Sequence, residues 1–222
     1  IPEFPMNHSQ ELIKINLVIE GDQIKGKGQT KFTGNKKSEM YYYLANTPIS
    51  KKELFFQNYI TNEDKNIKIE IEEIPTNESR ERDIEIDYSV ELNNRIIDLG
   101  KELYISVELD FAFNNYDMEE DRTRAFEFNR KTATEGETTL DLPVGMSVKY
   151  LPSPVEIDNQ DYKFQLSYIL KENPKVPKKT TIHYLKSIEI KNEILLPEQF
   201  ENWNKAIAKV KEFYGDQIIL QK

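Results

Sequence analysis

Apolar residues recur at three- and four-residue steps over residues 195–214, LLPEQFENWNKAIAKVKEFY, and this spacing predicts the one unambiguous helix of the chain. Pro197 suits the first helical turn, because an N–H at that position has no partner within the helix. We expect the helix to span 197–214 and Gly215 to end it in the left-handed conformation. The apolar stripe consists of Phe200, Trp203, Ile207, Val210 and Phe213 or Tyr214. Such a stripe needs a sheet to cover.

Most of the remaining chain alternates apolar and polar residues with the period of a half-buried strand. Residues 11–33 predict a hairpin around Gly21-Asp22, in which Gly26 and Gly28 indicate a bulge or a close backbone approach. Further strands are predicted at 66–74, 83–92, 101–113, on both sides of the Pro143-Val144-Gly145 turn, and at 161–170, 180–195 and 218–220. Strands joined by short turns are typical of a sandwich and not of a parallel α/β sheet.

Between Lys36 and Ile60 the period changes to that of helices, with Pro48 as an interruption and Ser50 as a candidate cap of a second helix. Rings that could stack on a ligand occur here, but core packing is the commoner role of rings at helical spacing. These rings are Tyr41, Tyr42, Tyr43, Phe55 and Phe56. We therefore predict a mainly β fold: an antiparallel β-sandwich with a short helical insertion and one C-terminal amphipathic helix packed on a sheet.

Three regions are predicted along the chain. Residues 1–6, IPEFPM, look like a disordered cloning scar, so the missing signal peptide does not indicate the compartment. Residues 7–113 form a β-rich region with the helical insertion at 36–60, and residues 114–222 form a second β-rich region that ends in the helix and a short strand. We expect the two β-rich regions to be one or two tightly packed sandwich domains.

The chain carries 30 Lys and Arg against 39 Asp and Glu, a formal net charge of −9. This excess of negative charge argues against non-specific binding to nucleic acid or to anionic lipid, because neutralised phosphates supply most of that affinity. No apolar run approaches the roughly 20 residues that span a bilayer. Neither nucleic acid nor a membrane span is therefore expected.

The sequence has no cysteine and two histidines, which removes disulfides, thiolate metal sites and a cysteine nucleophile. His8 lies beside the scar, and His183 lies opposite Ile182 and Tyr184 in an alternating strand, where an exposed or cross-strand role is expected. A zinc site and a serine triad are not expected, and no cofactor is predicted. A catalytic carboxylate pair stays open, because 39 acidic residues ensure that some lie close together.

Residues 114–123, NNYDMEEDRT, are the most polar stretch, and their carboxylates are weak candidates for a calcium site. The candidates are Asp117, Glu119, Glu120 and Asp121. The stretch lacks the glycine and the spacing of a known calcium loop, so a solvated turn is the expected structure. Arg122 and Arg124 follow, and we expect them to pair with this turn or to contact a partner.

The order of motifs in the second half carries a resemblance. Arg122 or Arg124 precedes the turn Leu142-Pro143-Val144-Gly145 and then Leu151-Pro152, and the chain ends with the proline-initiated helix and a short apolar strand. Over residues 121–222 the chain resembles the C-terminal domain of unknown function in bacterial transglutaminase-like proteins, and residues 10–113 fit the preceding region more loosely. The resemblance implies a mostly β domain that follows a Cys-His-Asp catalytic core. It also implies a periplasmic or cell-envelope location.

Three functions fit these patterns. The first is a non-catalytic accessory or interaction domain of a larger transglutaminase-like envelope protein, which contacts an upstream domain of the same polypeptide or a protein or glycan partner. The second is a carbohydrate- or peptide-binding module, and the third is a carboxylate-dependent hydrolase. The module would use the rings of Tyr104, Tyr116, Tyr150, Tyr162, Tyr168 and Tyr184, of which Tyr162 and Tyr168 are expected on opposite sides of their strand. We expect no enzymatic activity from the chain itself.

Overall fold

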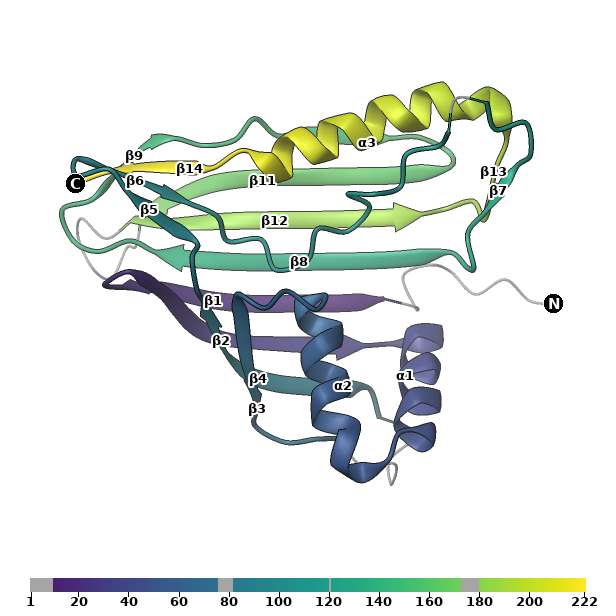
Figure 1. Ribbon diagram of the computed structural model, residues 1–222, viewed down its shortest axis with the longest axis horizontal. Helices are drawn as coiled ribbons and strands as arrows, with labels where there is room; N and C mark the ends of the chain where they lie inside the picture. The colour runs from purple at the N-terminus through teal and green to yellow at the C-terminus, as the bar shows by residue number, and fades with distance from the viewer. Residues whose placement is uncertain (1–9, 76–81, 120, 173–179) are drawn as a thin grey trace.

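The computed structural model describes residues 10–75, 82–119, 121–172 and 180–222. Its centre is an eight-stranded sheet. In spatial order the strands are β10 (Val155–Asp158), β11 (Tyr162–Glu172), β12 (Thr180–Ile190), β8 (Thr132–Asp141), β1 (Glu11–Glu20), β2 (Gln23–Phe32), β4 (Ile84–Leu92) and β3 (Ile67–Ile71). Strands from both predicted β-rich regions thus form one sheet (Figure 1).

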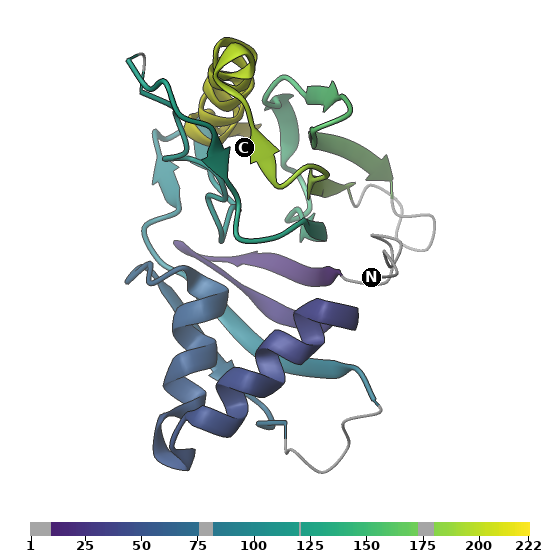
Figure 2. The ribbon, with the colours of Figure 1, turned by 90° about the vertical axis from the view of Figure 1, so that its right-hand side faces the viewer.

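Smaller elements cover this sheet. A four-stranded sheet has the order β5 (Ile96–Asp98), β6 (Glu102–Ile105), β14 (Ile218–Gln221) and β9 (Ser147–Tyr150), and β7 (Phe126–Glu127) pairs with β13 (Ile194–Leu195). The helices are α1 (Gly34–Asn46), α2 (Ile49–Thr61), the short 3-10 helix η2 (Pro197–Gln199) and α3 (Phe200–Gly215). Figure 1 shows α3 beside the β10–β11–β12 end and α1 and α2 beside the β2–β4–β3 end, and Figure 2 shows the two groups separated along the sheet.

The predicted fold class is confirmed: the protein is mainly β and sandwich-like, with a helical insertion and a C-terminal helix packed on a sheet. Among the described strands, the one parallel pair is β1 with β8, and the other pairs are antiparallel. Apolar alternation shows which residues share a face but not the direction of a neighbouring strand. The large sheet is therefore mixed, and the sequence prediction of an antiparallel sheet missed the parallel pair because alternation carries no information on strand direction.

The apolar stripe of α3 is buried as predicted, with Trp203 fully enclosed. The indole ring lies 5.0 to 6.0 Å, centroid to centroid, from four neighbouring aromatic rings, and its N–H donates to the carbonyl of Tyr116 at 2.6 Å. These rings belong to Phe113, Phe128, Tyr162 and Phe164. A buried indole with its N–H satisfied is a strong anchor, because it removes a large apolar area from water without leaving a donor unpaired.

The helix ends at Gly215 as predicted, but the predicted left-handed conformation of Gly215 is wrong. Gly215 has no positive φ, and the cap residue Asp216 is extended at φ −87° and ψ 156°. Strand β14 begins two residues later, so the chain must leave the helix in an extended path. The backbone N–H of Asp216 donates to the carbonyl of Glu212 at 3.1 Å, so one of the last carbonyls of the helix is satisfied without a left-handed residue.

Two local predictions also fail. Ser50 lies inside α2, and Pro48 is at the cap position without a side-chain hydrogen bond. The strand predicted over 101–113 ends at Ile105, because its neighbour β14 is only four residues long. The gaps between the predicted strands 66–74 and 83–92, and between 161–170 and 180–195, were expected to hold polar turns at 75–80 and 172–179, and these turns lie mostly outside the described residues.

None of the described helices is both long enough and apolar enough to cross a bilayer.

Glycines at two positions of the large sheet give a matched stability test. A Cβ at Gly26 would lie 1.9 Å from the carbonyl oxygen of Asn16, a main-chain atom held in the β1–β2 ladder. We expect Gly26→Ala to lower the free energy of unfolding by about 3 kcal/mol, the upper range for overpacking. In Gly136→Ala the Cβ would meet Lys186 at an ordinary 3.6 Å, so a change within about 1 kcal/mol is expected. Urea unfolding measures both, and equal losses would contradict this account.

Candidate functional site

A half-open cavity of about 520 Å³ lies on the inner face of the large sheet, between α2 and residues 107–110, which follow β6. Its floor is built from small residues: Gly136 lies beside Ile13, and Thr138 lies beside Ile15, in the β8–β1 register. Glycine and threonine leave the space that larger inward side chains would fill. The cavity is therefore the strongest candidate for a binding or catalytic site in the described part of the chain.

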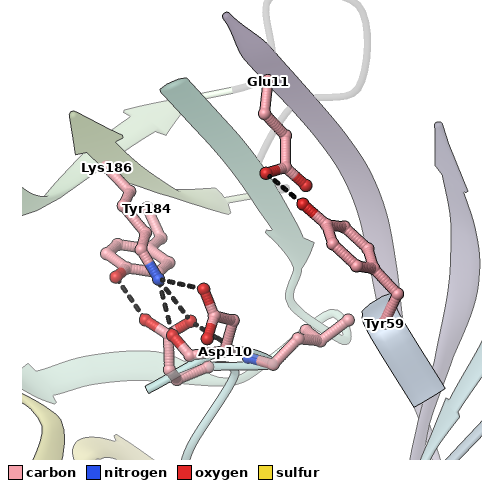
Figure 3. Close-up of polar contacts among 7 residues, drawn as sticks. Glu11, Tyr59, Asp110, Tyr184 and Lys186 are labelled. Carbon is pink, nitrogen blue, oxygen red and sulfur yellow. Dashed lines mark hydrogen bonds and ion pairs between the residues drawn. The ribbon is translucent and has the colours of Figure 1, made fainter. Parts of the chain in front are cut away.

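One wall of the cavity holds a buried ionic cluster (Figure 3). The ammonium of Lys186 donates to a carboxylate oxygen of Glu108 at 3.1 Å and to the carbonyl of Asp110 at 2.5 Å. The carboxylate of Glu108 also accepts the hydroxyl of Tyr184 and the N–H groups of Leu109 and Asp110. Both charged side chains are less than a tenth exposed, so these bonds replace the water that burial removes.

The cluster holds Lys186 and Tyr184 in their ordinary protonation states. Burial alone would lower the pKa of Lys186, but the carboxylates of Glu108 and Asp110 outweigh it and leave that pKa above its usual value. Burial, together with the charge of Glu108, raises the pKa of Tyr184 well above the ordinary range. Lys186 therefore stays an ammonium and Tyr184 stays a neutral phenol at physiological pH.

The opposite wall carries Glu11 of β1, whose carboxylate accepts the hydroxyl of Tyr59 from α2 at 2.9 Å (Figure 3). Burial raises the pKa of Glu11, and the nearby Lys36 of α1 opposes that shift only in part. Burial also raises the pKa of Tyr88 on the cavity floor to about 12. The site thus contains one carboxyl that gains a proton more readily than a solvated one.

The acidic turn that holds the weak calcium candidates packs against α3. Asp117 pairs with Lys211 of α3, and the backbone N–H and C=O of Met118 both bond to the side chain of Asn204 at 2.8 Å. Across the residues that the structure describes, no group of three or more metal-ligating side chains occurs. Glu119 and Asp121 are exposed, and Glu120 lies outside the described residues.

The two candidate arginines differ in surroundings. Arg122 donates to the backbone carbonyls of Arg124 and Ala125 at 3.0 and 3.2 Å, and its guanidinium lies 5.3 Å from the ring centroid of Phe126. Arg122 therefore stabilises its own turn through carbonyls and a ring. Arg124 is exposed and is the better placed of the two for a partner contact.

The tyrosines proposed as a binding face differ in exposure, since Tyr116 and Tyr150 are exposed and Tyr104 is half-buried. Tyr162 and Tyr184 are buried, and Tyr168 stacks on Tyr184 at 4.9 Å and on Phe213 of α3 at 5.3 Å. The expectation that Tyr162 and Tyr168 lie on opposite sides is wrong, because the two residues are six positions apart in β11, and residues an even number of positions apart share one face of a strand. His183 has the predicted cross-strand role, with its Nδ1 at 2.9 Å from Glu137.

Sequence reasoning missed the residues of the cavity. A signal existed for Lys186, which shares its strand face with Ile182, Tyr184 and Ile188, and a lysine on an apolar face marks a buried charge. Glu11 similarly shares a face with Ile15 and Leu17. No such signal existed for Glu108. It lies beyond the end of β6 at Ile105, so its burial depends on tertiary contacts and not on a strand pattern.

The ionic cluster predicts a large loss of stability when its cation is removed. Lys186→Met should lower the free energy of unfolding by about 3–5 kcal/mol, because it leaves the carboxylate of Glu108 buried without a cation. Lys27→Met is the control: Lys27 is also 3.1 Å from a carboxylate, that of Glu72, but both side chains are exposed. Its loss should not exceed about 1 kcal/mol.

The double variant Glu108→Gln with Lys186→Met should recover part of that loss, since no unpaired charge is then buried. Urea unfolding of the single and double variants provides the comparison. A double variant no more stable than Lys186→Met would show that the buried charge is not the cause.

The raised pKa of Glu11 predicts a pH-dependent stability difference. A carboxyl whose pKa is higher in the folded state contributes stability below its unfolded pKa, and that contribution is lost as the pH rises through the folded pKa. Glu11→Gln keeps an acceptor for Tyr59 but cannot ionise. The melting temperature of the variant minus that of the wild type should therefore rise between about pH 4 and pH 8. A flat or falling difference would contradict the shift.

Comparison with known proteins finds a family match for the second half of the chain. No curated protein matches the sequence. A family model described as a domain of unknown function with solved structure, DUF3858, matches residues 101–220. The matched residues run from β6 to β14 and include one wall of the cavity, with Glu108, Asp110, Tyr184 and Lys186. Because the match covers more than half of the 222 residues, the chain belongs to the DUF3858 family.

Proposed function

We propose that the chain is a non-catalytic accessory domain of a larger transglutaminase-like protein of the bacterial cell envelope, where it supports a catalytic core or binds a partner. The motifs behind the resemblance lie mostly within the matched residues 101–220. They are the Leu142-Pro143-Val144-Gly145 turn, Leu151-Pro152 and the proline-initiated helix. The envelope location is part of the same proposal and comes from the same resemblance.

The observation that carries the non-catalytic role is the state of the cavity's polar groups. A nucleophilic lysine needs a lowered pKa, whereas the pKa of Lys186 is raised by Glu108 and Asp110. The hydroxyl of Tyr184 is committed to Glu108, and that of Tyr59 to Glu11. Groups arranged in this way suit binding and stability better than bond-making chemistry.

The carboxylate-dependent hydrolase is a second candidate because of Glu11. A carboxyl with a raised pKa in a cavity fits a general acid, and Asp110 supplies a second carboxylate on the other wall. The two functions make opposite predictions for activity. Hydrolysis requires turnover by the chain alone, and that turnover should disappear in Glu11→Gln.

Turnover and association test the proposal together. The purified chain should leave generic ester, peptide and glycoside substrates intact. It should also associate with a separately expressed transglutaminase-like core from the same polypeptide, measured by calorimetry. Arg124→Glu should weaken this association about tenfold, because it reverses an exposed charge beside the turn.

Lys14→Glu is the matched control, since Lys14 is exposed on β1 far along the sequence from that turn. Turnover that Glu11→Gln abolishes would establish the hydrolase instead. Absence of both turnover and association would reject the accessory role.

A further inference from the structure

The phenol and ammonium donors of the cavity are already engaged within the protein. Tyr59 donates to Glu11, Tyr184 donates to Glu108, and Lys186 donates to Glu108 and Asp110. Tyr88 shares a hydrogen bond with Thr30 at 3.3 Å. An anionic ligand would therefore find its natural partner, the ammonium of Lys186, occupied by carboxylate and carbonyl oxygens.

Carboxylate acceptors, in contrast, lie on both walls. The carboxylate of Asp110 is about one third exposed and lies 3.7 Å from Lys186, beyond hydrogen-bond distance. The carboxylate of Glu11 on the opposite wall accepts a hydrogen bond from the hydroxyl of Tyr59 at 2.9 Å. Four lining carboxylates, those of Glu11, Glu63, Glu108 and Asp110, face the single lining ammonium of Lys186. The cavity consequently offers negative charge and hydrogen-bond acceptors.

The carboxyl-terminal end of α2 is an independent source of negative electrostatic potential in the cavity. The carboxyl-terminal end of α2 lines the cavity, with Asn58, Tyr59 and Ile60 in its last turns and Asn62 and Glu63 directly after it. The carboxyl end of a helix carries a partial negative charge, equivalent to roughly half a unit. Glu63 adds a full carboxylate at the same end. This end of the helix therefore favours a cation at the cavity.

Aromatic and aliphatic side chains form the rest of the lining. The rings are those of Phe55, Tyr59, Tyr88 and Tyr184, and the aliphatic residues include Ile13, Ile15 and Leu109. Ring faces attract cations, most strongly where water is excluded, and aliphatic walls bury an alkyl chain. The size of the cavity falls within the usual range for small-molecule sites.

We propose that this cavity is a binding site for an organic cation, an alkylammonium group whose charge lies between Glu11 and Asp110 and whose carbon chain packs on Ile13, Ile15 and Leu109. The group can belong to a free amine or to the side chain of a lysine in a peptide. The site goes beyond the accessory role and does not depend on it.

Three six-carbon probes of equal length test the proposal: hexylammonium, hexanoate and hexanol, titrated into the full chain and followed by NMR chemical shifts. Hexylammonium should bind saturably at least about tenfold more tightly than the other two, with shifts at Gly136, Thr138 and Tyr59. The Nα-acetylated amide of lysine forms a further arm. Tighter binding of that compound than of hexylammonium would identify a peptide lysine as the source.

Charge-neutralising variants locate the site. Glu11→Gln and Asp110→Asn should each weaken hexylammonium about tenfold. Glu135→Gln should leave the affinity unchanged, because it removes an equal charge from the exposed side of β8, next to Gly136. Equal binding of hexanoate or hexanol, no saturable binding up to about 10 mM, or an equal effect of Glu135→Gln would overturn the proposal.

Discussion

The parallel pairing of β1 with β8 is the constraint on which the rest of the structure depends. It runs from Glu11 opposite Thr134 to Val18 opposite Asp141, and it joins the first hairpin to strands that follow more than a hundred residues later. Without it the large sheet would divide into β10–β11–β12–β8 and β1–β2–β4–β3. The pairing therefore makes one structure from the DUF3858 region and the residues that precede it.

The cavity is a direct consequence of this pairing. Its two polar walls come from opposite sides of the β1–β8 line: Glu11 and Tyr59 precede the matched residues, and Glu108, Asp110 and Lys186 belong to them. The helices pack against the two ends of the sheet (Figure 2). Glu108 and Asp110, which follow β6, contact Tyr184 and Lys186 of the more central strand β12. Small residues such as Gly136 and Thr138 lie on the floor where the two halves meet.

The buried cluster shows how one wall tolerates charge. Burial removes the carboxylate of Glu108 and the ammonium of Lys186 from water, and the attraction of the pair alone does not offset this desolvation cost. Several further hydrogen bonds to the two side chains make up the difference. The same bonds fix the side chains, so the wall is rigid before any ligand arrives. On the opposite wall Glu11 has fewer partners, and burial acts on its pKa with less opposition. The two walls thus differ in how many hydrogen bonds stabilise their charged groups.

Much of the fold was predictable because its signals are local. The stripe from Phe200 to Tyr214 has helical spacing, and the hairpin around Gly21 alternates, so both were predicted correctly. The β1–β8 direction and the end of β6 depend on distant partners, and no periodicity reports them. The site was harder still: Lys186 carried a signal as a charge on an apolar face, whereas Glu108 became buried only through its tertiary contacts.

Native-state hydrogen exchange tests most directly whether the β1–β8 pairing makes one cooperative structure. The amides of β1 and β8 should open with the same free energy as those of β12 and β2, because they are central strands of a single sheet. The account would be contradicted if the amides of β1, β2 and β4 exchanged together at a clearly lower free energy than those of β8, β11 and β12. The two halves would then unfold separately, and the cavity between them would not be a stable feature of the protein.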